Sequence, residues 1–211
     1  GGYTISGVSL GAAGKEQAAA HEITDTRMRV ELKQPLKANG GTVQLKVKFA
    51  FNIPQYGTDR MGILPTKNGK IYEIAQWYPR MCVFDNILGW NTLPYLGQGE
   101  FYLEYGNIEY NITAPAKHII VGSGQLMNPA EVLTPQQLQR YRQAEQSDKT
   151  VMLRSVSEVT DPATRPSKDR LTWKFRCNNT RDVAWASSTA FVWDAARINL
   201  PAGKKALAMS A

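Results

Sequence analysis

The chain of 211 residues has little of the chemistry on which many enzymes depend. It holds two cysteines, Cys82 and Cys177, and two histidines, His21 and His118, all far apart in the sequence. A zinc site needs three or four such ligands at characteristic spacing. His21-Glu22 begins the zinc motif H-E-x-x-H, but the fifth position is Asp and the neighbouring residues predict a loop that enters a strand. We therefore expect neither a metal site nor a cofactor in this segment.

Other catalytic signatures are also missing. There is no G-x-S-x-G segment, so no serine triad is predicted. Gly122-Ser123-Gly124 is typical of a turn, because no phosphate-binding fingerprint surrounds it. Glu100 and Glu104 share one face of an expected strand and would suit a glycosidase-like carboxylate pair, but an exposed strand face is the simpler explanation.

The sequence also lacks strong charge runs and long apolar runs. The net charge is +7, but no run of five Lys or Arg occurs, which favours a solvated basic surface over nucleic-acid binding. No apolar stretch approaches the roughly 20 residues of a membrane helix. The first residues do not form a basic and then apolar leader. The Gly1-Gly2 start and the end at Ala211 lead us to expect an engineered boundary.

What is present is alternation of apolar and polar residues, which predicts β-strands. It is clearest over residues 43–51 and 171–177. Phe101 to Tyr105 and Ile108 to Ile112 predict a hairpin through Gly106-Asn107. Further strands are expected at 3–10, 28–32, 71–74, 77–84, 119–122, 151–156, 183–186 and 191–193. The fold class is therefore all-β (mostly), antiparallel-rich, in a single domain over residues 1–211.

One segment predicts a helix. Thr134 is typical of an N-cap and Pro135 of the first helical position. We expect one short surface helix over about residues 134–145, with Leu138, Tyr141 and Arg142 on one face.

The cysteines and aromatics leave alternatives open. Cys82 and Cys177 lie in expected strands among apolar neighbours, which favours two buried thiols, although a disulfide between adjacent strands would also fit. Aromatic residues are dense over residues 75–105. They indicate either core and sheet packing or a concave aromatic surface that meets another domain or a ligand.

Several segments in chain order carry a resemblance to one enzyme family. The sequence I-A-Q-W-Y-P-R-M-C-V-F-D (74–85) is similar to the T-Q-x-E-P…F-D region of the zinc aminopeptidases, the gluzincin family of aminopeptidase N and leukotriene hydrolase, and more closely to a bacterial branch. R-M-R-V-E-L (27–32), V-G-S-G-Q-L (121–126), L-T-W-K-F (171–175) and R-D-V-A-W-A (181–186) resemble later pieces. The likeness covers nearly the whole chain, but only the amino-terminal domain of that family.

The resemblance implies a saddle-like, multi-sheet β domain whose catalytic domain is absent. This segment would be non-catalytic, and zinc would belong to the parent's catalytic domain. Its partners would be its own downstream catalytic domain and the parent's peptide substrate, with no nucleic acid. Gln76 matches the family's substrate-lining Gln, whereas Tyr78 stands where the family has a Glu that holds the substrate's amino group. We expect Gln76 and Tyr78 to be the substrate-binding residues.

Two further classes of protein compete with this interpretation. A carbohydrate- or protein-binding β module should present two or three coplanar exposed aromatics, whereas a domain severed from a peptidase should expose one broad apolar patch. A structural β-sandwich is the third class. Since the bacterial relatives are often secreted, we expect a periplasmic or cell-envelope location.

Overall fold

The computed structural model describes residues 2–55, 60–94, 96–99 and 102–211. The chain is mostly β, built from several antiparallel sheets. This confirms the predicted fold class, including the helix near 134–145. The chain divides into two compact units: unit 1 comprises Gly1–Asn52 and Tyr78–Glu104, and unit 2 comprises Ile53–Trp77 and Tyr105–Ala211. The assignment of residues 1–211 to a single domain stays a prediction.

Unit 1 is built from short strands. Its three-stranded sheet has the order β2 (Gln17–Ala18), β1 (Thr4–Leu10), β5 (Leu45–Ala50). Two hairpins accompany it, β3 (His21–Thr24) with β4 (Arg27–Val30), and β8 (Phe84–Asp85) with β9 (Gly89–Trp90). The rings of Tyr3, Phe49 and Phe51 lie together, with centroids 5.0 and 5.6 Å from Tyr3.

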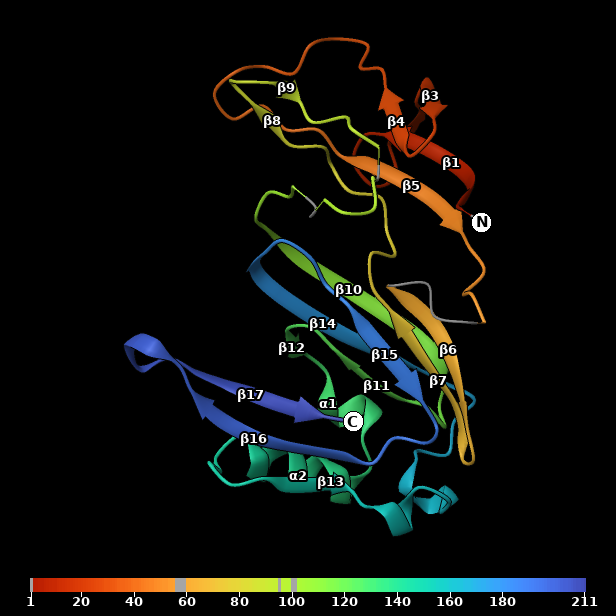
Figure 1. Cartoon of the computed structure of the whole chain (residues 1–211), viewed down its shortest axis with the longest axis vertical. Helices are drawn as coiled ribbons and strands as arrows, with labels where there is room; N and C mark the ends of the chain where they lie inside the picture. Colours follow the sequence, from red (N-terminus) through yellow and green to blue (C-terminus); the bar gives the residue numbers. More distant parts are fainter. Residues whose placement is uncertain (1, 56–59, 95, 100–101) are drawn as a thin grey trace. The chain divides into compact units, whose positions relative to one another are not determined.

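Among its described residues, unit 2 holds three sheets, two of three strands and one of four. One has the order β10 (Gly106–Pro115), β14 (Arg170–Thr180), β12 (Gln125–Leu126). A second has the order β11 (Ile119–Gly122), β15 (Trp185–Ser188), β7 (Gly69–Ile74), β6 (Met61–Thr66). The third has the order β13 (Val151–Arg154), β16 (Trp193–Asn199), β17 (Lys205–Ser210). Figure 1 shows β10 and β14 side by side as a long ribbon. The helices α1 (Pro129–Val132) and α2 (Pro135–Ala144) lie below them in this view.

The core of unit 2 follows from the alternation of buried and exposed residues along β14 and β10. Trp173 and Phe175 are buried and stand opposite Ile112 and Tyr110. The rings of Phe175 and Tyr110 stack at 5.0 Å. Trp193 of β16 packs edge-on against Trp173 at 6.4 Å. Since residues opposite each other in a ladder share a face, this side of the sheet is apolar and the other is polar.

Helix α2 begins where the sequence predicts. The Thr134 hydroxyl accepts a hydrogen bond from the Gln137 N–H, and the Gln137 side chain accepts one from the Thr134 N–H, both at 3.3 Å. The buried face is Gln137, Tyr141 and Ala144. The expectation for Tyr141 is thus confirmed, but Arg142 is exposed and Leu138 is half-buried. Gln137 turns inward because its amide caps the helix, and polar groups that are hydrogen-bonded can be buried.

Two predicted strands are wrong. Residues 77–83 form no strand, because Pro79 supplies no backbone donor in the middle of the segment. The hairpin through Gly106-Asn107 is absent, since both residues lie inside β10, which pairs with β14 instead. Leu103 and Tyr105 lie outside any strand, and Phe101 lies outside the described residues.

Candidate functional site

Gln76 and Tyr78, the predicted substrate-binding residues, lie just after β7. Gln76 belongs to unit 2 and Tyr78 to unit 1, and both are half-buried. Gln76 has a positive φ of 51°, a left-handed conformation that costs a residue with a side chain of order 1 kcal/mol. The Arg80 guanidinium lies over the Tyr78 ring at 5.8 Å. The role of Gln76 and Tyr78 in binding a substrate stays a prediction.

The histidines occupy ordinary structural positions. His21 is the first residue of β3, and its Nδ1 lies 3.0 Å from the Ala19 carbonyl. His118 is half-buried, with Nδ1 at 2.8 Å from the Ser187 hydroxyl. Burial, and then the charge of Arg165, lower the pKa of His118. Within the part of the chain that the structure describes, no three His, Cys, Asp or Glu side chains gather as metal ligands.

The cysteines differ from the expectation of two buried thiols. Cys82 is exposed and lies outside any strand, whereas Cys177 is half-buried in β14. Both are free thiols. Cys82 is exposed because the expected strand around it does not form.

An apolar hairpin, residues 84–90, is the most distinctive surface feature of unit 1. The Asp85 carboxylate accepts hydrogen bonds from the N–H groups of Ile87 at 2.9 Å and Leu88 at 2.7 Å. These bonds lower the pKa of Asp85 and hold the turn. Phe84 and Trp90 stand opposite each other, with ring centroids 5.2 Å apart and planes at 68°.

The turn exposes its apolar side chains while its base is anchored. Ile87 is 85% exposed and Leu88 is 77% exposed. Next to the hairpin, the Asn91 N–H donates to the Val83 carbonyl at 2.8 Å, and Val83 is buried. A hydrogen-bonded turn thus presents apolar side chains to solvent. The sequence does carry a signal for this turn, since Asp85-Asn86 and Gly89 lie between aromatic residues.

The two units differ in how much apolar surface they bury. Among the described residues, the buried apolar side chains of unit 1 are Val8 and Val83, whereas unit 2 buries twenty. Fourteen of the exposed large apolar side chains belong to unit 1: Tyr3, Ile23, Leu32, Leu36, Val43, Leu45, Met81, Phe84, Ile87, Leu88, Trp90, Leu93, Leu96 and Tyr102.

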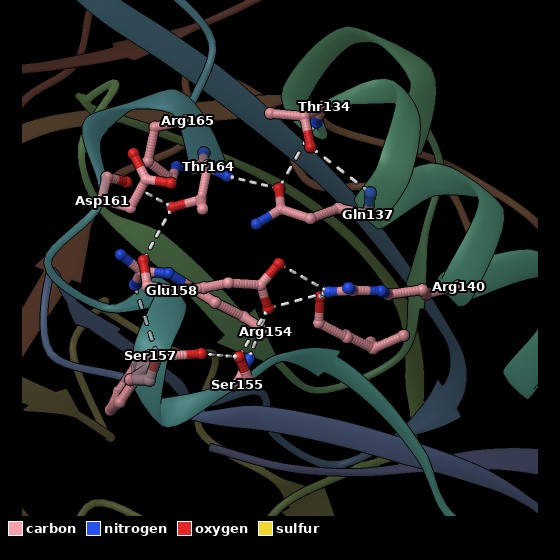
Figure 2. Close-up of polar contacts among 12 residues, drawn as sticks. Thr134, Gln137, Arg140, Arg154, Ser155, Ser157, Glu158, Asp161, Thr164 and Arg165 are labelled. Carbon is pink, nitrogen blue, oxygen red and sulfur yellow. Dashed lines mark hydrogen bonds and ion pairs between the residues drawn. The ribbon is translucent and has the colours of Figure 1, made fainter.

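Unit 2 contains a buried polar cluster around η1 (Val156–Glu158), shown in Figure 2. Both carboxylate oxygens of Glu158 lie 2.8 Å from Nη1 of Arg140, and the Ser155 N–H donates to the same carboxylate at 2.7 Å. Burial alone would raise the pKa of Glu158, but these hydrogen bonds lower it below the usual value. Buried Arg154 donates to the Val159 carbonyl at 2.8 Å. The cluster ties η1 to α2.

Arg165 is the second buried guanidinium of this cluster. Its three nitrogens donate to the Ala116 carbonyl at 3.0 Å, the Gln137 side chain at 3.0 Å and the Val132 carbonyl at 3.1 Å. Burial, and then the charge of Arg154, lower the pKa of Arg165 to about 10. Because each of the three Arg165 nitrogens meets a fixed carbonyl or amide oxygen, we assign the cluster a structural role.

A groove of about 1140 Å³ lies in unit 2, and we call it the β17 groove. Its lining comes from β6, β7, β11 and β15 on one side and from Leu207 and Met209 of β17 on the other. Nothing in the sequence singled out this groove.

Comparisons with known proteins identify no relative: a scan against models of protein families, a search of curated proteins and a search of solved structures each returned no match. In the described residues, no helix combines the length and the apolar character needed to cross a membrane.

Proposed function

We propose that this chain is a non-catalytic amino-terminal domain of a zinc metallopeptidase of the aminopeptidase N type. Its role is to pack on the parent's catalytic domain and to line one side of the substrate cleft. Zinc and the water-activating groups belong to that catalytic domain, where zinc would polarise the peptide carbonyl.

The exposed apolar surface of unit 1 is the observation that carries the proposal. A unit that buries Val8 and Val83 but exposes fourteen large apolar side chains lacks most of a core of its own. Such surface is stabilised when another domain covers it, at about 25 cal/mol for each Å² of apolar area removed from water. The resemblance of residues 74–85 to the aminopeptidase signature names the kind of domain that would cover it.

The two aromatic rings of the hairpin are not arranged as a sugar-binding platform. A sugar-binding platform needs coplanar exposed rings, but Phe84 and Trp90 cross at 68°. Their neighbours at the turn, Ile87 and Leu88, are aliphatic and carry no hydrogen-bonding groups for sugar hydroxyls. The hairpin is therefore better suited to a protein surface than to a glycan.

Gln76 and Tyr78 are the residues that we propose face the parent's substrate. A phenol is neutral at pH 7 and cannot give an ammonium group the charge-assisted hydrogen bond that a carboxylate gives. The parent would therefore bind a free amino terminus more weakly than enzymes with a Glu at the position of Tyr78. In the full-length parent, Tyr78→Glu should lower KM for substrates with a free amino terminus and leave KM for acetylated substrates unchanged.

Zinc content and peptidase activity test the proposal. The protein product of the complete gene should bind one zinc per chain and hydrolyse aminoacyl-anilides or internally quenched peptides. The 211-residue chain alone should do neither. Stoichiometric zinc and hydrolysis by the 211-residue chain would contradict the non-catalytic role, and a complete gene without an H-E-x-x-H motif after Ala211 would contradict the family.

A further inference from the structure

The outer edge of β17 presents unpaired backbone groups. β17 pairs with β16 on one side, with Arg197 opposite Leu207. The Arg197 N–H donates to the Ser147 carbonyl at 2.8 Å, which lies on the other side of β16. Because bonded and non-bonded pairs alternate in an antiparallel ladder, the N–H and C=O groups of Leu207 and Met209 point away from β16. These groups have no hydrogen-bond partner in the described parts of the chain.

The same two residues of β17 line the β17 groove. The groove's floor is the sheet of β11, β15, β7 and β6, where Val121, Ala186, Glu73 and Gly62 stand opposite one another in one row. Residues in register share a face, so this row of the floor presents Val121, Ala186 and Gly62 together with the Glu73 carboxylate. The volume of about 1140 Å³ is slightly above the usual range of ligand pockets, which suits a chain segment.

Two charged side chains in the groove are available to a ligand. Glu73 lies within the floor and is exposed, and its carboxylate makes no hydrogen bond or ion pair to any described residue. Arg60 lies opposite Ala75, whose N–H donates to the Arg60 carbonyl at 2.9 Å. The guanidinium of Arg60 is also unpaired among the described residues. A basic side chain of a ligand could therefore pair with the Glu73 carboxylate, and an acidic one with Arg60.

We propose that the β17 groove binds an extended peptide segment of a partner protein. The segment pairs with β17 as an added strand, with main-chain hydrogen bonds to Leu207 and Met209, and places a basic side chain against Glu73. This mode of recognition takes affinity from the backbone pairing and specificity from the side chains that face the floor.

The opposite wall of the groove does not offer the same pairing. In the β6–β7 hairpin, the Ala75 N–H donates to the Arg60 carbonyl. Along β6 the backbone groups therefore point alternately toward β7 and away from it, and Pro65 is among the residues whose backbone groups point away. Proline supplies no donor, which is how natural sheets protect an exposed edge. The outward-facing positions of β17 are Lys205, Leu207 and Met209, and none is a proline, so β17 offers more donors to an added strand than β6 does.

Binding of short peptides tests this proposal in the 211-residue chain. The probe is a fluorescein-labelled, amidated peptide, Thr-Val-Lys-Val-Thr. Its comparators are the same peptide with Glu in place of Lys and a version with every backbone nitrogen methylated, which lacks main-chain donors. Fluorescence anisotropy gives the Kd, and amide chemical shifts locate the contact. The Lys peptide should bind more tightly than both comparators and shift the amides of Leu207 and Met209.

Proline substitutions provide the matched variants. Leu207→Pro removes an outward donor without breaking a bond to β16, and should raise the Kd of the Lys peptide by roughly tenfold or more. The backbone groups of Lys205 also point away from β16, but Lys205 lies outside the groove. Lys205→Pro should therefore leave the Kd within about twofold of the value for the unsubstituted chain. Glu73→Gln should abolish the preference for Lys over Glu.

Several results would overturn the proposal. These are no binding of the Lys peptide at millimolar concentration, equal binding of the methylated peptide, and equal effects of the two proline variants. Protection of the Leu207 and Met209 amides in a dimer without peptide would mean that a second copy pairs with β17. If Leu207→Pro does not fold, the methylated peptide carries the test with the unsubstituted chain. The proposal does not depend on zinc or peptidase activity, so it stands or falls separately from the proposed function.

Discussion

Folding displaces the pKa values of two residues in unit 2, Glu158 of the polar cluster and Tyr141 of α2. Glu158 is hydrogen-bonded on both carboxylate oxygens, and Tyr141 is buried beside the ring of Trp193 at 6.4 Å. Each group has a pKa that folding displaces, Glu158 downward and Tyr141 upward to about 12. The charged form is favoured by folding at Glu158, and the neutral form at Tyr141.

Glu158→Gln should lower the free energy of unfolding at pH 7 by roughly 1–3 kcal/mol, because it leaves the half-buried Arg140 without a carboxylate. Since folding lowers the pKa of Glu158, the stabilisation is present above the unfolded value of about 4.3 and is lost as pH falls through the folded value. Urea unfolding at pH 7 and pH 3.5 should therefore show a smaller difference between variant and wild type at pH 3.5.

The control is Glu109→Gln, which removes an exposed ion pair with Arg176 whose atoms are 2.8 Å apart. An exposed pair contributes about 1 kcal/mol or less. If Glu109→Gln costs as much as Glu158→Gln, the buried cluster does not have the structural role that we assign to it.

Tyr141→Phe should make the protein less sensitive to alkali. Burial raises the pKa of Tyr141 to about 12, so its stabilisation is complete below the unfolded value of about 10 and is lost as pH rises through about 12. Between these values each pH unit costs up to about 1.4 kcal/mol from this one group. Guanidinium unfolding at pH 9 and pH 11 should show a smaller loss in Tyr141→Phe. An unchanged loss would contradict this account of Tyr141.

Among the elements, those specified by local sequence were the most predictable. Thr134-Pro135 places the start of α2 correctly because a helix cap depends on neighbouring residues alone. Gly106-Asn107 has the local preference of a turn, but pairing of β10 with β14 along its whole length overrides it. The strand β17 was not predicted, because alanine alternates with its larger residues and weakens the periodic signal.

The candidate site was predictable only in part. The sequence shows that residues 75–105 are rich in aromatics. Because aromatic residues are common both in cores and at interfaces, composition does not predict whether these residues are buried or exposed. Exposure of Phe84 and Trp90 follows from a short hairpin that has no sheet to cover it. The β17 groove depends on register between strands far apart in the chain, which no local pattern reports.

The cap of α2 gives a prediction at this scale. Thr134→Ala should lower the free energy of unfolding by about 1 kcal/mol, because the Gln137 N–H loses its acceptor. Thr134→Ser keeps the hydroxyl and should fall within about 0.5 kcal/mol of wild type. Chemical denaturation measures both, and equal losses in the two variants would show that the hydroxyl does not cap the helix.

The whole molecule combines one unit that has a core with one that exposes its apolar side chains. Unit 2 buries two tryptophans, Trp173 and Trp193, almost completely. Unit 1 buries Val8 and Val83 among its described residues. A small domain with so little buried apolar surface is marginally stable by itself. The proposed function therefore predicts that a covering domain would stabilise unit 1.

Substitutions in and beside the apolar hairpin should separate exposed from buried positions. Leu88→Asp should change the free energy of unfolding by less than about 0.5 kcal/mol and reduce binding of a hydrophobic dye, because Leu88 is exposed. Val83→Ala should cost roughly 1–2 kcal/mol, because Val83 is buried. Equal costs would mean that the hairpin is folded against the rest of the chain and is not free to bind a partner.

Hydrogen exchange in the complete gene product and in the 211-residue chain tests the central claim most directly. If a catalytic domain covers unit 1, the amides of residues 83–93 should exchange at least roughly tenfold more slowly in the complete protein, which corresponds to about 1.4 kcal/mol of added protection. The amides of β10 and β14 serve as the internal reference and should be equally protected from exchange in both proteins. Equal exchange of residues 83–93 in the two proteins would contradict the claim that this surface packs on a catalytic domain.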